Sequence, residues 1–341
     1  MKCVMDLQII LILGFFCMIL HTSLYAASIK VGLVMDDALL NDRIINEGAY
    51  NGLVQSEKKL GIRGTAVKAK NEADYLNLMN RFALAGYDLI IGVGHHMAGA
   101  AKESAGKFPQ TKYLLIDVSL KGYSNISSAI FASQEIGFLA GALSAMVDRD
   151  QSIQLPVRHN GILGFIGIAI TSSVRRELAG FSQGAYYINP DIKIIQRMMD
   201  GYESAEIVKQ MAFEQYSKGA DIIYHVAGDS SEGVTQASKE FDFLSIGSSN
   251  YRSQDDEHVL ILKHKHYHEV VFRTVKDLLN GSFKSGVNLF DLKKGAINIS
   301  QLNKKVPYYI NYQLNKIKKD IISENIKVGL DVPDLVKKQN F

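Results

Sequence analysis

Two short apolar runs, Asp88-Leu-Ile-Ile-Gly-Val93 and Tyr113-Leu-Leu-Ile-Asp-Val118, decide the fold. Neither run alternates apolar with polar residues, so neither fits a strand with one face in water. Strands of a parallel sheet need apolar residues on both faces, because crossover helices cover both sides of the sheet. The two runs therefore predict an α/β protein built around a parallel sheet.

The same signal recurs on both sides of these runs and alternates with helical periodicity. Further strands are expected over residues 29–35, 64–70, 161–168, 193–196, 221–226 and 243–247, and helices over 41–60, from 73 onward and over 136–147. The pattern restarts after a polar segment, residues 148–160, which we interpret as a surface loop because it has no Pro/Gly/Ser-rich linker composition. Two sets of strand–helix units predict two lobes.

Composition places the chain among globular proteins and excludes several classes of function. Of its 341 residues, 47% are hydrophobic and 21% charged, which argues against both a disordered tail and a polytopic membrane protein. The formal net charge of +3 is too small to indicate a nucleic-acid partner. Both cysteines, Cys3 and Cys17, lie near the N-terminus, so we expect no disulfide, thiol nucleophile or cysteine metal site in the folded part.

The N-terminal residues predict export. Lys2 precedes an apolar run over residues 7–20, which is shorter than a membrane span of about 20 residues but typical of a signal-peptide core. In one alternative the signal sequence comprises residues 1–26 and is cleaved after Ala26. In the other, Cys17 becomes the acylated first residue and anchors the chain to the membrane. The expected location is the periplasmic face of the inner membrane or the cell envelope.

Common enzyme motifs are absent from the sequence, which has no phosphate loop, no Gly-x-Ser-x-Gly elbow and no His-Glu-x-x-His zinc helix. The segment Gly92-Val-Gly-His-His-Met-Ala-Gly99 spaces its glycines wrongly for a dinucleotide fingerprint, so we interpret it as a strand-to-helix turn. His95 and His96 in this turn are candidate ligand contacts, because ligands of open α/β sheets bind beyond the carboxyl ends of strands. The alternative is that they are plain turn residues. We predict no enzyme activity and no cofactor.

Acidic and histidine side chains give two further candidate sites. Asp36 and Asp37 follow the first strand and Asp117 ends a later one, so all three are expected at one edge of a sheet, where carboxylates suit the hydroxyls of a polyol. Helix capping by Asp36 and a loop role for Asp117 are the alternatives. His264, His266 and His268 would share one face of a strand. Solvent-facing histidines are the favoured interpretation there, and no metal site is predicted.

Several segments then carry a resemblance to a known family. They are Lys30-Val-Gly-Leu-Val-Met-Asp36, Asn46-Glu-Gly-Ala-Tyr-Asn-Gly52, Phe131-Ala-Ser-Gln-Glu135-Ile-Gly-Phe-Leu-Ala-Gly141, Gly180-Phe-Ser-Gln-Gly-Ala185 and Ile222-Ile-Tyr-His-Val-Ala-Gly228. In order and spacing they resemble the basic membrane protein family of bacterial substrate-binding lipoproteins, which includes purine nucleoside receptors. The resemblance implies a type I periplasmic-binding fold of two doubly wound lobes joined by three crossovers. Lobe 1 would hold residues 28–133 with 265–283, and lobe 2 residues 134–264 with 284–341.

The same resemblance implies a function. The chain would be the monomeric solute receptor of an ABC-type nucleoside uptake system, closing its lobes around the ligand and delivering it to a permease in the inner membrane. In the family's motifs an acid and a lysine hold the ribose, and these positions match Asp117 and Lys265. Asn46 and Gly228 also match the family's pattern.

Three pocket positions depart from that pattern. Ile45 and Glu177 stand where the family has stacking phenylalanines, and Ser249 stands where it has a second ribose acid. Base–aromatic stacking contributes ~1–3 kcal/mol per base, so loss of both rings predicts purine nucleoside binding weaker by about two orders of magnitude. Phe181, Tyr251 and His95 are the neighbouring residues that would offer a substitute ring.

These departures leave an alternative function open. In it the chain is a surface lipoprotein whose pocket has degenerated and which interacts with a macromolecule, aided by the lysine-rich residues 304–338. A C-terminal helix packed on the second lobe is expected over residues 306–322, with its lysines in water.

Overall fold

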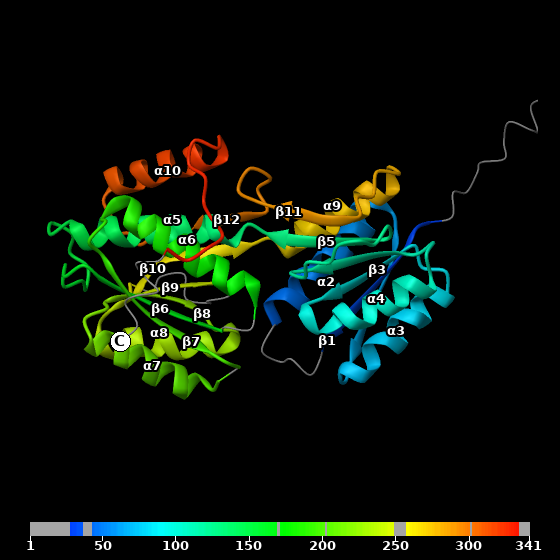
Figure 1. Ribbon diagram of the computed structural model, residues 1–341, viewed down its shortest axis with the longest axis horizontal. Helices are drawn as coiled ribbons and strands as arrows, with labels where there is room; N and C mark the ends of the chain where they lie inside the picture. The colour runs from blue at the N-terminus through cyan, green and yellow to red at the C-terminus, as the bar shows by residue number, and fades with distance from the viewer. Residues whose placement is uncertain are drawn as a thin grey trace, which may run out of the picture.

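The computed structural model describes residues 28–36, 43–168, 171–201, 203–248, 257–300 and 302–333. Its described strands form two six-stranded sheets, each the centre of one lobe, and the two lobes lie next to each other along the long axis of the molecule (Figure 1). Helices cover both faces of each sheet. The structure therefore confirms the predicted α/β fold of two doubly wound, mainly parallel lobes.

The first sheet has the strand order β11-β5-β4-β3-β1-β2, with every neighbouring pair parallel. Its strands are β1 (Lys30–Asp36), β2 (Arg63–Ala69), β3 (Leu89–Val93), β4 (Lys112–Ile116), β5 (Ile126–Phe131) and β11 (Gly286–Phe290). Successive residues of β1 point to opposite faces: Leu33 packs toward α2 (Arg43–Leu60) and α9 (Tyr267–Leu279), and Val34 toward α3 (Glu72–Leu84) and α4 (Ala98–Lys107). Both faces are apolar because helices cover both.

The second sheet has the order β12-β10-β9-β8-β6-β7, in which only the β10–β12 pair is antiparallel. Its strands are β6 (Ile162–Ile168), β7 (Lys193–Met199), β8 (Ile222–Val226), β9 (Leu244–Ser248), β10 (Val259–Lys265) and β12 (Ile297–Ser300). Its helices are α5 (Ser133–Arg149), α6 (Ser172–Ile188), α7 (Ala205–Ser217), α8 (Glu232–Phe241) and α10 (Tyr308–Ile322). Helices α7 and α8 cover the face opposite α5 and α6 (Figure 1).

The chain passes between the lobes three times, from β5 to α5, from β10 to α9 and from β11 to β12. Two boundaries differ from the expected division. Lys265, expected in lobe 1, ends β10 of the second sheet, and the last passage lies beyond the expected boundary after residue 283. Residues 286–290 pair with β5 from Gly286 opposite Ser127 to Phe290 opposite Phe131, so this segment extends the first sheet instead of joining the second lobe. The physical reason is that β11 satisfies the backbone groups along the open edge of β5.

Helices α5 and α6 approach each other until their backbones touch. A Cβ atom added at Gly180 would lie 1.9 Å from the carbonyl oxygen of Gln134, and one added at Gly137 would lie 2.2 Å from that of Glu177. The glycines in this contact are Gly137, Gly141, Gly180 and Gly184. They belong to the glycine-containing segments noted in the sequence, and they pack one helix against the other and so set the position of Glu177.

The C-terminal helix α10 packs on α5 of the second lobe, as predicted. Ile310, Leu314, Ile317 and Ile321 are buried on one side of it, while Lys316 and Lys319 are exposed on the other. The helical period explains both faces. No described helix is both long and apolar enough to cross a membrane. The predicted leader and Cys17 lie outside the described residues.

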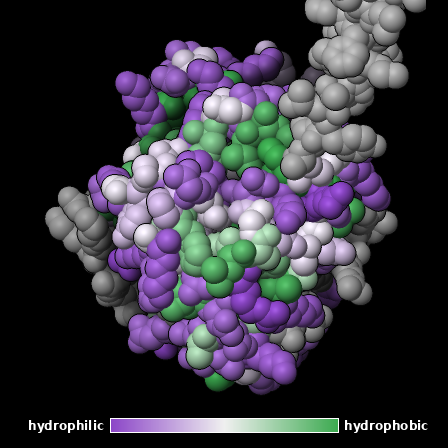
Figure 2. Space-filling view, turned by 90° about the vertical axis from the view of Figure 1, so that its right-hand side faces the viewer, coloured by the Kyte–Doolittle hydropathy of each residue, from purple (hydrophilic) through white to green (hydrophobic). Residues whose placement is uncertain are grey.

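The outer end of the first lobe is a mixed surface. Figure 2 shows hydrophobic patches interspersed among hydrophilic side chains at this end of the molecule. The exposed large apolar residues of the lobe include Leu84, Leu279, Val287 and Leu289. Val287 and Leu289 alternate along the edge strand β11.

Candidate ligand-binding site

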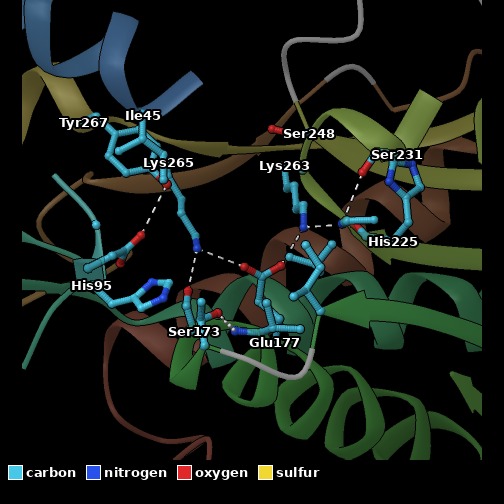
Figure 3. A pocket seen from close by; sticks show the side chains of 18 residues that line it. Ile45, His95, Ser173, Glu177, His225, Ser231, Ser248, Lys263, Lys265 and Tyr267 are labelled. Carbon is cyan, nitrogen blue, oxygen red and sulfur yellow. Dashed lines mark hydrogen bonds and ion pairs between the residues drawn. The ribbon is translucent and has the colours of Figure 1, made fainter. Parts of the chain in front are cut away.

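A cavity of about 170 Å³ lies between the lobes, at the carboxyl ends of the parallel strands (Figure 3). Residues of both lobes line it. The first lobe contributes Ile45, Gly94, His95, Asp117 and Tyr267. The second lobe contributes Ile168, Thr171, Ser173, Val174, Glu177, His225, Val226, Ala227, Gly228, Ser231, Ser248, Lys263 and Lys265. This is the position at which open α/β sheets bind ligands.

A fully buried carboxylate organises the second-lobe wall of the cavity. Glu177 Oε2 accepts hydrogen bonds from Lys263 Nζ at 2.6 Å and from the Tyr224 hydroxyl at 2.7 Å. Its Oε1 lies 3.0 Å from Lys265 Nζ. Burial by itself would raise the pKa of Glu177, but the two ammonium groups and the hydrogen bonds outweigh it and lower that pKa to about 2. Glu177 is therefore ionised and holds two lysines at the cavity.

The local sequence explains why these side chains meet. Lys263 and Lys265 are two residues apart on β10, so strand alternation puts both on the side that faces α6. His264 points the other way, where its Nε2 forms a hydrogen bond with the hydroxyl of Ser300 on β12. On α6, the helix that carries Glu177, the first turn is capped by the Thr171 hydroxyl, which accepts from Val174 N at 3.3 Å.

Lys265 faces Asp117, the acidic residue contributed by the other lobe. Lys265 Nζ donates to the Ser173 hydroxyl at 2.8 Å, and the Ser173 and Ser133 hydroxyls are 3.0 Å apart. Asp117 follows β4 with φ 60°, a left-handed conformation that Asp tolerates better than most residues. Burial raises the pKa of Asp117, and the positive charge of Lys265 opposes that rise. The carboxyl group of Asp117, from the first lobe, and the ammonium group of Lys265, from the second, thus line the same cavity.

The turn after β3 has the predicted form. Gly94 adopts φ 86° and leads into the short 3₁₀ segment η2 (His95–Met97) and then α4. His95 lines the cavity, which supports its selection as a ligand contact, and burial lowers its pKa. The neighbouring His96, also a candidate contact, is not among the described residues that line the cavity, and its Nδ1 lies 2.9 Å from Glu72 Oε1.

Two expected contacts lie elsewhere. The Asp36 carboxylate accepts a hydrogen bond from the Tyr75 hydroxyl of α3, and Asn46 Nδ2 donates to the Asp36 carbonyl at 3.1 Å. Neither Asp36 nor Asn46 is among the described residues that line the cavity. The reason is strand alternation, since Asp36 shares the face of β1 that Val34 presents to α3.

The other expected contacts divide between the cavity and the undescribed residues. The cavity brings together Ile45, Gly228 and Glu177 with Asp117 and Lys265. Ser249 lies outside the described residues, although its neighbour Ser248 lines the cavity, and Asp37 and Tyr251 also lie outside them. Phe181 is fully buried and stacked on Tyr224 with ring centroids 5.2 Å apart, so it offers the cavity no ring.

Several lining residues were not predicted from the sequence, among them Lys263, Ser173, His225 and Tyr267. The spacing of Lys263 could have identified it: it lies two residues before Lys265, so both side chains point to the same face if this segment is a strand. Ser173, His225 and Tyr267 carried no such signal, since nothing local distinguishes them from other buried or half-buried side chains. Tyr267 nevertheless matters to the site, because its hydroxyl donates to Asp117 Oδ2 at 3.4 Å.

The three closely spaced histidines do not lie on one element. β10 ends at Lys265 and α9 begins at Tyr267, so His264 belongs to a strand, His266 to the junction and His268 to a helix. Their rings follow one another at centroid distances of 5.9 and 5.6 Å. Among the residues that the structure describes, no group of three or more His, Cys, Asp or Glu is placed to hold a metal ion.

Two doubly wound lobes, three connecting passages and a cavity between strand ends are typical of two-lobed proteins that bind a small ligand between the lobes. The match to the family described as ABC transporter substrate-binding protein PnrA-like extends over residues 29–331, and the chain belongs to this family. Its members are substrate-binding proteins of ABC transporters, not enzymes. Such proteins take a small-molecule ligand, act with a permease, and are exported and typically associated with the cell envelope.

Curated relatives share about a quarter of their residues with the chain. The ABC transporter nucleoside-binding protein BmpA of Lactococcus lactis is 26% identical over 323 residues, covering 88% of this chain and 89% of the relative. Basic membrane protein A of Borreliella afzelii is 27% identical over 315 residues, covering 88% and 91%.

Solved structures confirm the fold. A solute-binding protein of an ABC transporter system from Aeropyrum pernix superimposes with a TM-score of 0.73 at 21% identity, covering 91% of this chain and 96% of that one. A transcriptional activator of the comK gene from Bacillus halodurans gives a TM-score of 0.74 at 20% identity, covering 87% and 99%.

Proposed function

We propose that this protein captures a neutral, ribose-containing solute, with nucleosides as the first candidates, and delivers it to an ABC permease. The observation that carries the proposal is the placement of Asp117 and Lys265, from different lobes, at one cavity. A carboxylate accepts hydrogen bonds from two sugar hydroxyls, and an ammonium group donates to a hydroxyl or ring oxygen. A ribose diol between these groups would bond to both lobes at once.

The charges around the cavity support a neutral ligand. Among the described residues that line the cavity are two carboxylates, Glu177 and Asp117, and two ammonium groups, Lys263 and Lys265. Burial lowers the pKa of His225 to about 3, so its imidazole is neutral near pH 7. Opposite formal charges in the lining thus balance, and a ligand that brought a net charge would leave a poorly solvated charge in the closed protein.

Aliphatic side chains support a weakly polar ring system in the ligand. Ile45 comes from α2 of the first lobe, and Ile168, Val174 and Val226 come from the second. A nucleobase between them would gain dispersion and hydrophobic contact without face-to-face stacking on a phenylalanine. We therefore expect tolerance of different bases and lower affinity than a site with two rings. The nucleoside-binding relative from Lactococcus lactis supports the same class of ligand.

Closure of the lobes follows from a ligand that contacts both. Binding stabilises the closed arrangement by the difference in ligand affinity between the open and closed states. The three passages between the lobes are the places where such a hinge bends, and the permease then recognises the closed form. Acylation of Cys17 would hold the receptor beside its permease, which remains part of the proposal.

Isothermal titration of the purified protein with adenosine, guanosine, inosine and ribose tests the assignment. We expect binding of at least one nucleoside, with Lys265→Met weakening it by about 10- to 100-fold, the effect of losing one charged hydrogen-bond donor. Lys102→Met is the matched control, because Lys102 is exposed on α4 and is not among the described residues that line the cavity. Folded protein that gives no heat with any of the four compounds would contradict the proposal and favour the surface-protein alternative.

A further inference from the structure

Glu177 differs from every other acid at the cavity because it is fully buried and holds two cations. Its side chain has no exposed area, and those of Lys263 and Lys265 are 9% and 14% exposed. In Figure 3 the carboxylate lies between the two lysine side chains. The close contact of α5 with α6 fixes the backbone on which it stands. The cluster is therefore rigid and poorly solvated, and the charge of each member acts strongly on its neighbours.

The charged groups facing the cluster can be counted. Asp117 is the other lining acid, and it is under the influence of Lys265, Glu177 and, on α6, Arg176. The lining imidazoles, His95 and His225, both have lowered pKa values because of burial. Within the part of the lining that the structure describes, removing the charge of Glu177 would therefore leave two ammonium groups beside the carboxylate of Asp117, and this part of the cavity would become positive.

We propose that Glu177 is the specificity-determining residue for ligand charge: by neutralising Lys263 and holding Lys265, it makes the cavity accept neutral ribosyl compounds and reject their phosphorylated forms. This inference rests on the proposed function, since it concerns the same cavity. Glu177 needs no direct contact with the ligand, because it acts through the two lysines. It is in this sense a positioning residue whose charge also sets selectivity.

The chemistry of phosphate explains the rejection. A phosphate monoester carries about −1.5 to −2 charges at pH 7, and its oxygens accept strong hydrogen bonds from lysine ammonium groups. Here those ammoniums already serve Glu177, whose oxygens lie 2.6 and 3.0 Å from them. A phosphate would have to share these donors with a buried anion that repels it. A neutral ribose brings no such repulsion, and it needs only Asp117 as an acceptor and Lys265 as a donor.

The test compares neutral and phosphorylated members of two pairs: adenosine with adenosine 5′-monophosphate, and ribose with ribose 5-phosphate. Affinities are measured by isothermal titration for wild type, Glu177→Gln and the double variant Glu177→Gln/Lys263→Met. In wild type we expect the neutral member to bind tighter. In Glu177→Gln the affinity ratio should shift toward the phosphorylated member by about tenfold or more, and in the double variant, where both partners of the ion pair lose their charge, it should return toward wild type.

Controls separate charge selectivity from damage to the fold. Glu103→Gln removes an exposed carboxylate of α4 and should leave the ratio unchanged. Circular dichroism and thermal unfolding establish that each variant folds. Should Glu177→Gln fail to fold, Lys263→Met provides the opposite perturbation, because it leaves Glu177 with one lysine. That variant should shift the ratio further toward the neutral member, and a shift toward the phosphorylated member would overturn the inference.

The failures of the two proposals are distinguishable. Wild-type protein that binds adenosine or ribose, together with a Glu177→Gln ratio equal to wild type, overturns the role of Glu177 and leaves the proposed function standing. Wild-type protein that binds the phosphorylated members tighter also overturns it. Wild-type protein that binds neither member of either pair, and neither guanosine nor inosine, contradicts the proposed function itself.

Discussion

Replacement of Gly180 by alanine tests how the contact between α5 and α6 supports the site. The new Cβ would lie 1.9 Å from the carbonyl oxygen of Gln134. A normal carbon–oxygen contact is about 3.3 Å, so the two backbones must separate locally by about 1.4 Å. The obstacle is a backbone carbonyl in a helix, which cannot rotate away as a flexible side chain would.

The magnitude follows from two opposing effects. Overpacking of a well-packed core costs about 1–3 kcal/mol and more when backbone must move, whereas alanine in place of a helical glycine gains about 1 kcal/mol. Because the contact is far shorter than any real Cβ contact, we expect a net loss of about 2 kcal/mol or more in the free energy of unfolding. Glu177 lies one turn away on the same helix, so displacement of α6 should also weaken ligand binding.

The assay is urea unfolding followed by circular dichroism, combined with ligand titration of the folded variant. Gly106→Ala is the matched control: Gly106 is also in a helix, α4, but a Cβ there would meet nothing within 4 Å. This variant should gain about 0.5–1 kcal/mol of stability, the ordinary advantage of alanine over glycine. A Gly180→Ala protein as stable as wild type, or one stabilised like the control, would refute the argument that this glycine is required by backbone contact.

Two predictions concern protonation. Burial raises the pKa of Asp117, and bound hydroxyls favour its ionised form, so ligand binding should release protons and affinity should fall as the pH is lowered toward that pKa. Calorimetric titrations in buffers of different ionisation enthalpy measure the protons released, and the Asp117→Asn variant should show no such release. Proton uptake on binding would contradict this prediction. Burial also raises the pKa of Glu135 from 4.5 to about 7, although its carboxylate accepts a hydrogen bond from Leu292 N at 2.9 Å. Because the folded protein binds this proton more tightly than the unfolded chain, the free energy of unfolding should decrease as the pH rises from 4.5 to 7. Denaturant unfolding at several pH values measures this decrease, and it should be smaller in the Glu135→Gln variant. An equal decrease in the variant and in wild type would contradict this assignment.

Strand ends that the sequence marks clearly predicted two of the residues that line the cavity, Asp117 and His95. Asp117 ends an apolar run, and His95 follows another, so their location at the carboxyl edge of one sheet needed only the rule for parallel sheets. Asp36 also lies at the end of a strand, but it does not line the described part of the cavity, because its side chain faces α3 and accepts a hydrogen bond from the Tyr75 hydroxyl. Which face of a strand meets the ligand depends on which helix covers the other face, and that is a tertiary fact.

Helix packing explains why glycines recur in the sequences of α5 and α6. The segments containing Gly137 and Gly180 supported the family assignment as a pattern of letters. Only the structure shows that these glycines let two helices touch backbone to backbone. A sequence marks a glycine, but the reason for it depends on what lies within a few ångströms.

The family resemblance placed Lys265 at the site, whereas the pattern of the sequence predicted the α/β class, the two lobes and the position of Asp117 at the end of a strand. These follow from local periodicity, since each strand or helix must match its own apolar faces to its own neighbours. The tertiary structure alone decided that β11 completes the first sheet and that Glu177 binds Lys263, a residue 86 positions away. Local periodicity does not encode such pairings, because they form only when separate elements pack and a buried charge must find its partner.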